Sequence, residues 1–384
     1  MIPYGRQQIS EEDIQAVVEI LRSDWLTQGP MVKRFERAVA DYCEARYAVA
    51  VSSGTAALHL AALAAKFGPS DEIITSPITF VASANCIVYT GASPVFADID
   101  SRTYCIDPEQ IKHKNTKKTK GIIPVHFAGQ PCDIARIATV AKQNNLIVIE
   151  DAAHAIGANY KVDSRSYKVG SCAHSDMTTF SFHPVKHITT GEGGIITTND
   201  YALYTRLRLL RTHGITRDRQ ALKRDDGPWY YEQQDLGFNY RITDLQCALG
   251  LSQLKRLDEF IMRRKKIAAE YNKAFEGVED IRVPFQKKEA DSSWHLYVLG
   301  FRETKRGNVF NALRKRGIGV NVHYIPVHMQ PYYQEYFGYV AGDFPKAEEY
   351  YAGAITLPLY PAMTDNEVNY IIESILDLVR SGSK

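Results

Sequence analysis

The sequence lacks any long uninterrupted run of apolar residues. Nowhere in its 384 residues is there a stretch of about eighteen uncharged apolar residues, the length that a membrane-spanning helix needs. The N-terminal segment Met1–Glu12 has no apolar core of the kind found in a secretory signal peptide. We therefore expect no membrane insertion and no secretion, and we predict a cytoplasmic location.

The sequence also lacks an excess of charge of either sign. Its 46 Lys and Arg residues nearly balance its 44 Asp and Glu residues, which leaves a formal net charge of +2. This balance gives no reason to expect a nucleic acid or a membrane surface as a partner. One basic run, His113–Lys120, is interpreted as a solvated helix end and loop.

Several short motifs are absent as well. The six cysteines are scattered and never form C-x-x-C, which predicts reduced thiols in the cytoplasm and no disulfide framework. Neither the dinucleotide fingerprint G-x-G-x-x-G nor the phosphate loop G-x-x-x-x-G-K-S/T occurs. A nicotinamide-dependent oxidoreductase is therefore disfavoured, and the test for one is whether a nicotinamide cofactor co-purifies.

What is present is a lysine between an apolar strand and a glycine turn. Lys186 follows the apolar run that begins at Phe180 and precedes Gly191-Glu-Gly-Gly194. Desolvation in such a pocket disfavours the charged ammonium and makes a neutral, nucleophilic amine accessible. Lys186 is our candidate for a Schiff-base bond to pyridoxal phosphate. A lone lysine in a turn is more often an exposed surface residue, so the assignment depends on its neighbours.

The second candidate is an acid at the end of a buried strand. The apolar run Leu146–Ile149 leads into Glu150-Asp151, followed by His154. Ligands in open α/β sheets bind beyond the carboxyl ends of the strands, so Asp151 is expected to face a cleft. An anion there suits the pyridine nitrogen of pyridoxal phosphate, whose protonated ring is the electron sink. The alternative is that Asp151 is a helix N-cap, which stays open at this point.

A third element is the small-residue turn Ser53-Gly-Thr-Ala56 between a strand and a helix. The free N–H groups at such a helix start can hold a phosphate. The Ser53 turn, Asp151 and Lys186 follow one another in this order along the chain. With these three elements the chain resembles the sugar-nucleotide aminotransferases, which depend on pyridoxal phosphate. Further matching stretches are Trp25–Pro30, Pro77–Phe80, Ser181–Lys186 and Gly237–Arg241, so that the resemblance covers nearly the whole chain.

This resemblance implies a set of cofactor contacts. Lys186 would hold the cofactor and move protons, Asp151 would pair with the pyridine nitrogen, and His154 would lie near the ring hydroxyl. The other implied contacts are Phe80 stacked on the ring, Thr55, Ala56 and Ser181 at the phosphate, and Asn239 from the second subunit of a homodimer with shared active sites. Relatives that dehydrate the sugar carry histidine at the position of Lys186. The lysine here therefore favours transamination.

The substrate contacts are implied by the same resemblance. Within the family, the pattern is most similar to enzymes that aminate C4 of a UDP-linked 4-keto-6-deoxy N-acetylhexosamine, a precursor of pseudaminic acid. L-Glutamate would be the amino donor, with ping-pong kinetics. The implied substrate-binding residues are Gly29, His323, Tyr324, His328 and Arg241. Metal binding by His323 and His328 is disfavoured, because they lie five positions apart on a turn and no cysteine or carboxylate cluster is near. No metal is predicted.

Three alternatives stay open. The chain could aminate another nucleotide-linked keto sugar, at C3 or C4, carried by UDP or dTDP. It could be a non-transaminating pyridoxal-phosphate enzyme of the same fold, which product analysis would reveal. It could also be a non-catalytic relative, in which Lys186 or Asp151 is expected to be missing; both are present.

The predicted architecture is α/β, the fold type I of pyridoxal-phosphate-dependent transferases. Strands near 46–52, 71–76, 93–98, 120–126 and 145–150 alternate with helical stretches, which predicts a mostly parallel, seven-stranded type of sheet covered by helices. A large cofactor domain with an N-terminal arm is predicted over 1–245, and a smaller α+β domain over 246–384. We also predict a long loop over 217–240, one helix over 243–275 and a strand over 320–324.

Overall fold

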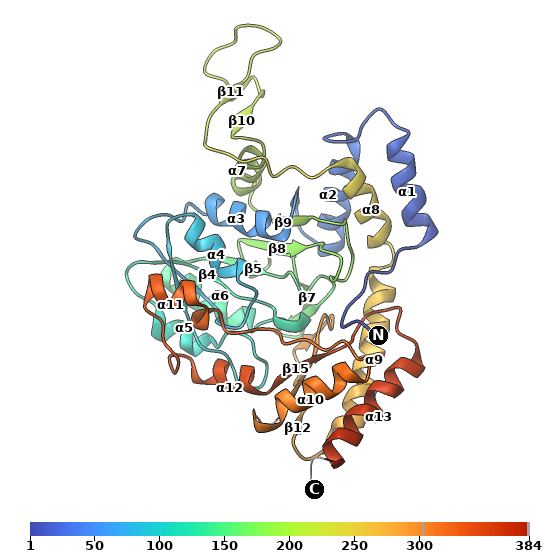
Figure 1. Cartoon of the computed structure of the whole chain (residues 1–384). Helices are drawn as coiled ribbons and strands as arrows, with labels where there is room; N and C mark the ends of the chain where they lie inside the picture. Colours follow the sequence, from blue (N-terminus) through green and yellow to red (C-terminus); the bar gives the residue numbers. More distant parts are fainter. Residues whose placement is uncertain (302, 382–384) are drawn as a thin grey trace.

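Helices and short strands alternate along most of the chain, which folds as an α/β protein (Figure 1). The computed structural model describes residues 1–301 and 303–381. Its α-helices are α1 Glu11–Leu21, α2 Pro30–Cys43, α3 Gly54–Ala64, α4 Ala82–Tyr89, α5 Pro108–Lys114, α6 Ile134–Asn144, α7 Tyr201–Arg211, α8 Asp244–Leu254, α9 Leu257–Phe275, α10 Glu303–Lys315, α11 Pro331–Phe337, α12 Pro345–Gly353 and α13 Asp365–Ser381. Within these described ranges, no helix combines the length and the apolar character needed to cross a bilayer.

The strands are short and fall into one large sheet and several small ones. They are β1 Tyr47–Val51, β2 Glu72–Thr75, β3 Ser93–Phe96, β4 Thr119–Ile123, β5 Ile147–Asp151, β6 Asn159–Val162, β7 Arg165–Lys168, β8 Met177–Ser181, β9 Gly194–Thr198, β10 Ile215–Thr216, β11 Glu232–Gln233, β12 Ile281–Arg282, β13 Ala290–Asp291, β14 Tyr297–Phe301 and β15 Ala354–Leu357.

The large sheet has seven strands in the order β1-β9-β8-β5-β4-β2-β3. Strands β3, β2, β4, β5 and β8 pair in parallel, whereas β9 is antiparallel to both β8 and β1. In this sheet β9 therefore runs against the direction of all the others. The predicted fold class, with a mostly parallel seven-stranded sheet, is confirmed.

Helices cover both faces of this sheet, as its buried apolar strands require. In β1, side-chain alternation sends Val49 and Val51 to one face and Ala48 and Ala50 to the other. The first pair packs in a cluster with α3, α4 and α7, and the second packs with α2, α6 and α9. Because both sides are packed, the strand ends hold fixed positions.

The predicted single helix over 243–275 is wrong, because α8 and α9 are separated at residues 255–256. Gln253 Nε2 at the end of α8 donates to Asp13 Oδ2 at 2.5 Å, and Arg256 lies 3.7 Å from the same carboxylate. Asp13 is fully buried on α1. The break is therefore tied to a contact between distant helices, which the local apolar spacing does not report.

The C-terminal part of the chain has a small antiparallel sheet, β12-β14-β15, packed with α9, α10 and α13 in its own apolar cluster. The strand predicted over 320–324 is wrong: only Asn321 pairs there, with Thr356 in an isolated bridge. The neighbouring carbonyl of His323 instead accepts a hydrogen bond from Tyr350 Oη at 2.5 Å. The predicted boundary between a large domain over 1–245 and a smaller one over 246–384 stays a prediction.

The segment between α7 and α8 projects from the body of the molecule (Figure 1). We call this segment the hairpin arm. It includes the long loop predicted over 217–240, and the structure adds a short two-stranded hairpin, β10–β11. Trp229 and Leu236 on this hairpin arm are 73% and 76% exposed.

Candidate active site

The carboxyl ends of the parallel strands bring distant parts of the sequence to one edge of the sheet. β1 ends at Val51 shortly before the Ser53 turn, β5 ends at Asp151 and β8 ends at Ser181. The strand register pairs both Val51 and Ser181 with Gly194, the first residue of β9. This edge is where open α/β sheets bind their ligands.

A cavity of about 560 Å³ lies at this edge, a volume typical of small-molecule sites. Eight of the residues predicted from the sequence line it: Thr55, Phe80, Asp151, His154, Ser181, Lys186, His323 and Tyr324. We call it the lysine cavity. The structure thus brings most of the predicted site residues into one chamber.

Lys186 lies in the turn after β8, and its side chain lines the lysine cavity. The backbone N–H of Lys186 donates to the carbonyl of His183 at 2.8 Å, and this hydrogen bond fixes the turn. Desolvation lowers the pKa of Lys186 to about 8, although the Asp151 carboxylate nearby favours the charged form. An amine with this pKa is neutral and nucleophilic in a substantial fraction of molecules near neutral pH.

Asp151 is buried, and both of its carboxylate oxygens accept hydrogen bonds. Ser83 Oγ donates to Oδ2 at 2.5 Å, and the N–H of Ala153 donates to Oδ1 at 3.1 Å. The Ser83 hydroxyl has one proton, so Thr79 Oγ1, at 2.6 Å from Ser83 Oγ, must be the donor in that contact. These hydrogen bonds fix the orientation of the carboxylate.

Three buried histidines pack against one another beside Lys186, with their rings tilted. The ring centroids of His154 and His295 are 4.4 Å apart, and those of His295 and His187 are 5.4 Å apart. Burial, supported by the positive charge of Lys186, holds the pKa of all three well below the usual range, so they are neutral at pH 7. Tyr324 Oη lies 3.1 Å from His154 Nε2, whereas His154 Nδ1 is buried without a hydrogen-bond partner among the described residues.

The start of α3 gives the lysine cavity an anion-binding end. Ser53 caps the helix, and its Oγ accepts a hydrogen bond from the N–H of Ala56 at 3.0 Å. A Cβ on Gly54 would lie only 2.8 Å from Ser181 Cβ, so the helix start and the end of β8 approach closely. The hydroxyls of Thr55 and Ser181 meet there with helix-start N–H groups, an arrangement typical of phosphate sites. Ala56 itself is buried and does not line the cavity.

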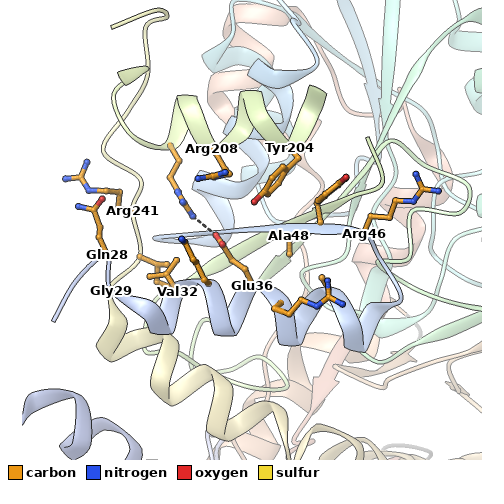
Figure 2. A pocket seen from close by; sticks show the side chains of 15 residues that line it. Gln28, Gly29, Val32, Glu36, Arg46, Ala48, Tyr204, Arg208 and Arg241 are labelled. Atoms are coloured by element: carbon orange, nitrogen blue, oxygen red, sulfur yellow. Dashed lines mark hydrogen bonds and ion pairs between the residues drawn. The ribbon is translucent and has the colours of Figure 1, made fainter. Parts of the chain in front are cut away.

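Besides Ala56, four predicted residues do not line the lysine cavity. Gly29 and Arg241 line a second cavity, shown in Figure 2. Asn239 is exposed between the hairpin arm and α8. His328 is fully buried, with Nε2 at 2.9 Å from Glu348 Oε1. Within one chain, these four side chains do not line the chamber of Lys186.

Sequence reasoning missed Tyr4, Ser83 and His295, which also line the lysine cavity. Tyr4 arrives there because the N-terminal segment crosses the C-terminal part, where the N–H of Leu359 donates to the carbonyl of Tyr4 at 3.1 Å. No local pattern reports such a contact. Ser83 had a usable signal, because it lies three residues after Pro77–Phe80, one of the stretches that carry the family resemblance.

The residues of the lysine cavity fit pyridoxal phosphate. The close approach at Gly54 forms a cradle for the phosphate, and the ionised Asp151 suits a protonated ring nitrogen. The unsatisfied, buried His154 Nδ1 lies on a ring that lines the same cavity as the Lys186 amine. This fold and this site define the pyridoxal-phosphate-dependent transferases of fold type I.

The chain belongs to the DegT/DnrJ/EryC1/StrS aminotransferase family, whose model matches residues 7–376. SpsC of Bacillus subtilis, a spore coat polysaccharide biosynthesis protein, is 46% identical over 384 residues, or 99% of this chain and 97% of SpsC. Among solved structures, PseC of Helicobacter pylori, an aminotransferase involved in the biosynthesis of pseudoaminic acid, is 33% identical with a TM-score of 0.90, covering 99% of each chain. Spr1654 of Streptococcus pneumoniae in its PLP form is 34% identical with a TM-score of 0.90, also covering 99% of each chain.

These comparisons identify the protein as a sugar aminotransferase that depends on pyridoxal phosphate. The predicted enzyme class and cofactor are confirmed.

Proposed function

We propose that the enzyme transfers the amino group of L-glutamate to C4 of a UDP-linked 4-keto-6-deoxy N-acetylhexosamine, a precursor of pseudaminic acid. The likeness to PseC, with a TM-score of 0.90 over 99% of both chains, is the observation that carries this substrate. The lysine cavity has room for a sugar beside the cofactor, since its volume is about 560 Å³.

In this proposal Lys186 is the catalytic base and acid. Bound pyridoxal phosphate supplies a reactive carbonyl group and an electron-accepting ring. Lys186 Nζ would hold the cofactor covalently. Once released, the amine would take the proton from the α-carbon of glutamate, and in the second half-reaction it would deliver a proton to C4 of the sugar. The pKa of about 8 suits both directions, because proton transfer is most effective when the pKa lies near the working pH.

The other residues of the lysine cavity hold the cofactor in place. Asp151 would pair with the protonated ring nitrogen, and hydrogen bonds from Ser83 and Ala153 hold its carboxylate in place. Thr55 and Ser181 would bind the phosphate at the start of α3. The remaining proposed contacts are Phe80, which is 58% exposed in this chain, against the ring and His154 at the ring hydroxyl. The N–H of Ala56 is already used by Ser53 Oγ, so Ala56 is not proposed as a contact.

We further propose that two copies of the chain share their active sites. Asn239 is exposed and does not line the lysine cavity of its own chain, as expected for a residue that reaches the phosphate site of a partner. Gly29 and Arg241 lie away from Lys186 in the same way and are proposed to contact the substrate from the second copy. His323 and Tyr324 contact the sugar from within the chain. His328, paired with Glu348, supports this segment from behind.

The test follows the two halves of the reaction on the purified holoenzyme. We expect glutamate to bleach the visible absorption band of the bound cofactor, and the UDP-linked 4-keto sugar to restore it, as ping-pong kinetics require. Mass spectrometry and NMR of the product should show a new amine at C4. The variant Lys186→Ala should give neither change.

Other outcomes would point to other functions. An amine at C3, or turnover only with a dTDP-linked sugar, would contradict the proposed substrate but keep the enzyme class. A surface-polysaccharide sugar other than a pseudaminic acid precursor is the second candidate, because SpsC is 46% identical to this chain. The same assay with a panel of nucleotide-linked keto sugars, including the C5 epimers, separates the two candidates by relative kcat/KM.

A further inference from the structure

A second cavity, of about 520 Å³, lies between α2 and α7 above the free edge of β1 (Figure 2). We call it the edge cavity. It shares no lining residue with the lysine cavity, yet the two are similar in volume. Its floor is apolar, formed in part by Val32, Ala40 and Ala48. A chamber of this size is large enough for a molecule such as a nucleotide.

Positive charge dominates the walls of the edge cavity. Glu36, its one acidic lining residue, is already engaged: its Oε1 accepts from Arg211 Nη1 at 2.6 Å and from the N–H of Ala50 at 3.0 Å. Arg37 pairs with Asp41 on the same helix. The lining side chains that form no ion pair with any carboxylate in the described part of the chain are Lys33, Arg46, Arg208 and Arg241. Concentrated, uncompensated cations in a concave surface attract anions.

One buried group also lacks a partner. Arg211 is 14% exposed at its side chain, and its Nη1 serves Glu36 and the carbonyl of Ala50. Its Nε, by contrast, is buried and has no hydrogen-bond partner in the described residues. An unsatisfied N–H on a buried guanidinium is costly. Because Arg211 Nε is shielded from solvent, a ligand in the edge cavity would interact with the positive charge of Arg211 and not with this N–H.

The strand edge offers a neutral hydrogen-bonding pair as well. The backbone N–H of Ala50 donates to Glu36 and its carbonyl accepts from Arg211, so both groups point away from β9. In an antiparallel ladder this direction alternates, so the N–H and carbonyl of Ala48 point the same way and belong to the cavity floor. One donor beside one acceptor matches the amide-like edge of a nucleobase. Tyr47 and Tyr204, stacked with centroids 4.7 Å apart, add an aromatic wall.

We propose that the edge cavity is a second ligand site, which binds a nucleoside diphosphate independently of the lysine cavity. The diphosphate lies against Arg46 and Arg208, and the base lies over the edge of β1. This part of the cavity is away from its other end, where Gly29 and Arg241 lie (Figure 2). Arg208 is held for this role by its own contact, with its guanidinium 5.4 Å from the centre of the Tyr204 ring. The inference rests on the charges and the strand edge, and not on the proposed sugar substrate.

The experiment measures binding of UDP and of inorganic pyrophosphate to the holoenzyme, whose phosphate site is filled by its cofactor. The test variant is the double substitution Arg46→Gln with Arg208→Gln. The control is Arg22→Gln with Arg34→Gln, which removes the same charge from exposed positions outside both cavities. Calorimetry gives the number of ligands bound and each Kd, and light scattering gives the oligomeric state.

We expect the wild type to bind one equivalent of UDP that the double variant loses, with Kd raised about tenfold or more. The control should stay within about twofold of the wild type. Pyrophosphate should compete for that equivalent, and UDP should bind more tightly than pyrophosphate because the base contributes. Turnover of the keto sugar should be the same in the double variant and the wild type. If the enzyme does not accept that sugar, the UDP-binding result still stands, because binding is measured without turnover.

Three results would overturn the proposal. Equal UDP binding in the wild type and the double variant would place all nucleotide binding elsewhere. Equal losses in the double variant and the control would show only a general charge effect. A change of oligomeric state in the double variant, without loss of a bound nucleotide, would show that a second copy of the chain covers the edge cavity.

Discussion

One hydroxyl proton makes the shorter of the two hydrogen bonds to the Asp151 carboxylate. Ser83 donates it to Oδ2 at 2.5 Å and receives in turn a hydrogen bond from Thr79. Hydrogen bonds to a charged group contribute more than those between neutral groups, about 1.5–3 kcal/mol each. Ser83 is therefore a positioning residue, which acts on the cofactor through the carboxylate.

We expect Ser83→Ala to weaken pyridoxal phosphate binding about tenfold or more, because Asp151 loses its shortest donor. The visible spectrum of the bound cofactor should also change its dependence on pH. Fluorescence titration of the apoenzyme and spectra recorded across the pH range measure the two effects. The control is Thr79→Val, which leaves the bond from Ser83 to Asp151 in place. Equal losses in both variants would contradict a specific role of Ser83.

The first residue of β9 packs directly on the turn that starts α3. A Cβ on Gly194 would lie 2.4 Å from the carbonyl oxygen of Ser53 and 2.8 Å from the nitrogen of Gly54. Both atoms belong to the backbone, so a side chain there cannot be accommodated by a rotamer change. The antiparallel strand β9 thus depends on glycine at its start, and the anion-binding end of the lysine cavity depends on β9.

We expect Gly194→Ala to lower the free energy of unfolding by about 1–3 kcal/mol, because it forces the two backbones apart. Binding of pyridoxal phosphate should weaken more than binding of pyridoxal, since the phosphate end is displaced. Urea denaturation and cofactor titration measure these changes. Gly68→Ala is the matched control, because no atom lies within 4 Å of its Cβ. A variant with normal stability and normal preference for the phosphate would contradict the expectation.

Elements with a strong local pattern could be predicted from the sequence. The run before Asp151 is mostly apolar and mostly buried, and β5 ends at that residue. Ser53 and Lys186 follow strands of the same kind, and parallel strands bring their carboxyl ends to one edge. Most of the residues that line the lysine cavity can therefore be predicted from short sequence patterns, together with the rule that parallel strands end at the same edge of a sheet.

Contacts between distant segments could not be predicted in this way. The break between α8 and α9 involves Asp13 on α1, and apolar spacing continues across it. Residues 320–324 have strand-like composition, but their partners are Thr356 and the Tyr350 hydroxyl. Tyr4 reaches the lysine cavity through a backbone contact with Leu359. In each case the deciding energy comes from tertiary packing, and not from local preference.

Across the whole molecule, buried neutral histidines make the fold sensitive to acid. Burial lowers the pKa of His154, His187 and His295 well below the usual range, and that of His323 to about 4. In the unfolded chain the same side chains bind protons near their ordinary pKa of about 6.5. Between pH 6.5 and 4 the unfolded state therefore holds more protons, and stability falls as the pH falls.

We expect the free energy of unfolding of the apoenzyme to decrease steeply below about pH 6.5, by up to about 1.4 kcal/mol per pH unit for each of these histidines. Urea denaturation at a series of pH values measures the slope. His295→Gln should reduce the slope by about one histidine's share, whereas His113→Gln, at an exposed position, should leave it unchanged. Stability that rises on acidification would contradict the assignment.

The position of Asn239 has a consequence for mixtures of variant chains. It is exposed at the base of the hairpin arm, whereas Lys186 lines the lysine cavity. In the proposed dimer, Lys186→Ala and Asn239→Ala damage different halves of each site. Random pairing of the two variants would give mixed dimers in which one site carries both native residues, about a quarter of all sites.

Refolding the two variants together should therefore restore activity that neither has alone, and a turnover assay before and after mixing measures it. Activity no greater than the sum of the separate variants would show that each chain builds its site by itself. If the sites are shared, two defective copies of the gene would complement each other in one cell, a genetic property that depends on where a single asparagine lies.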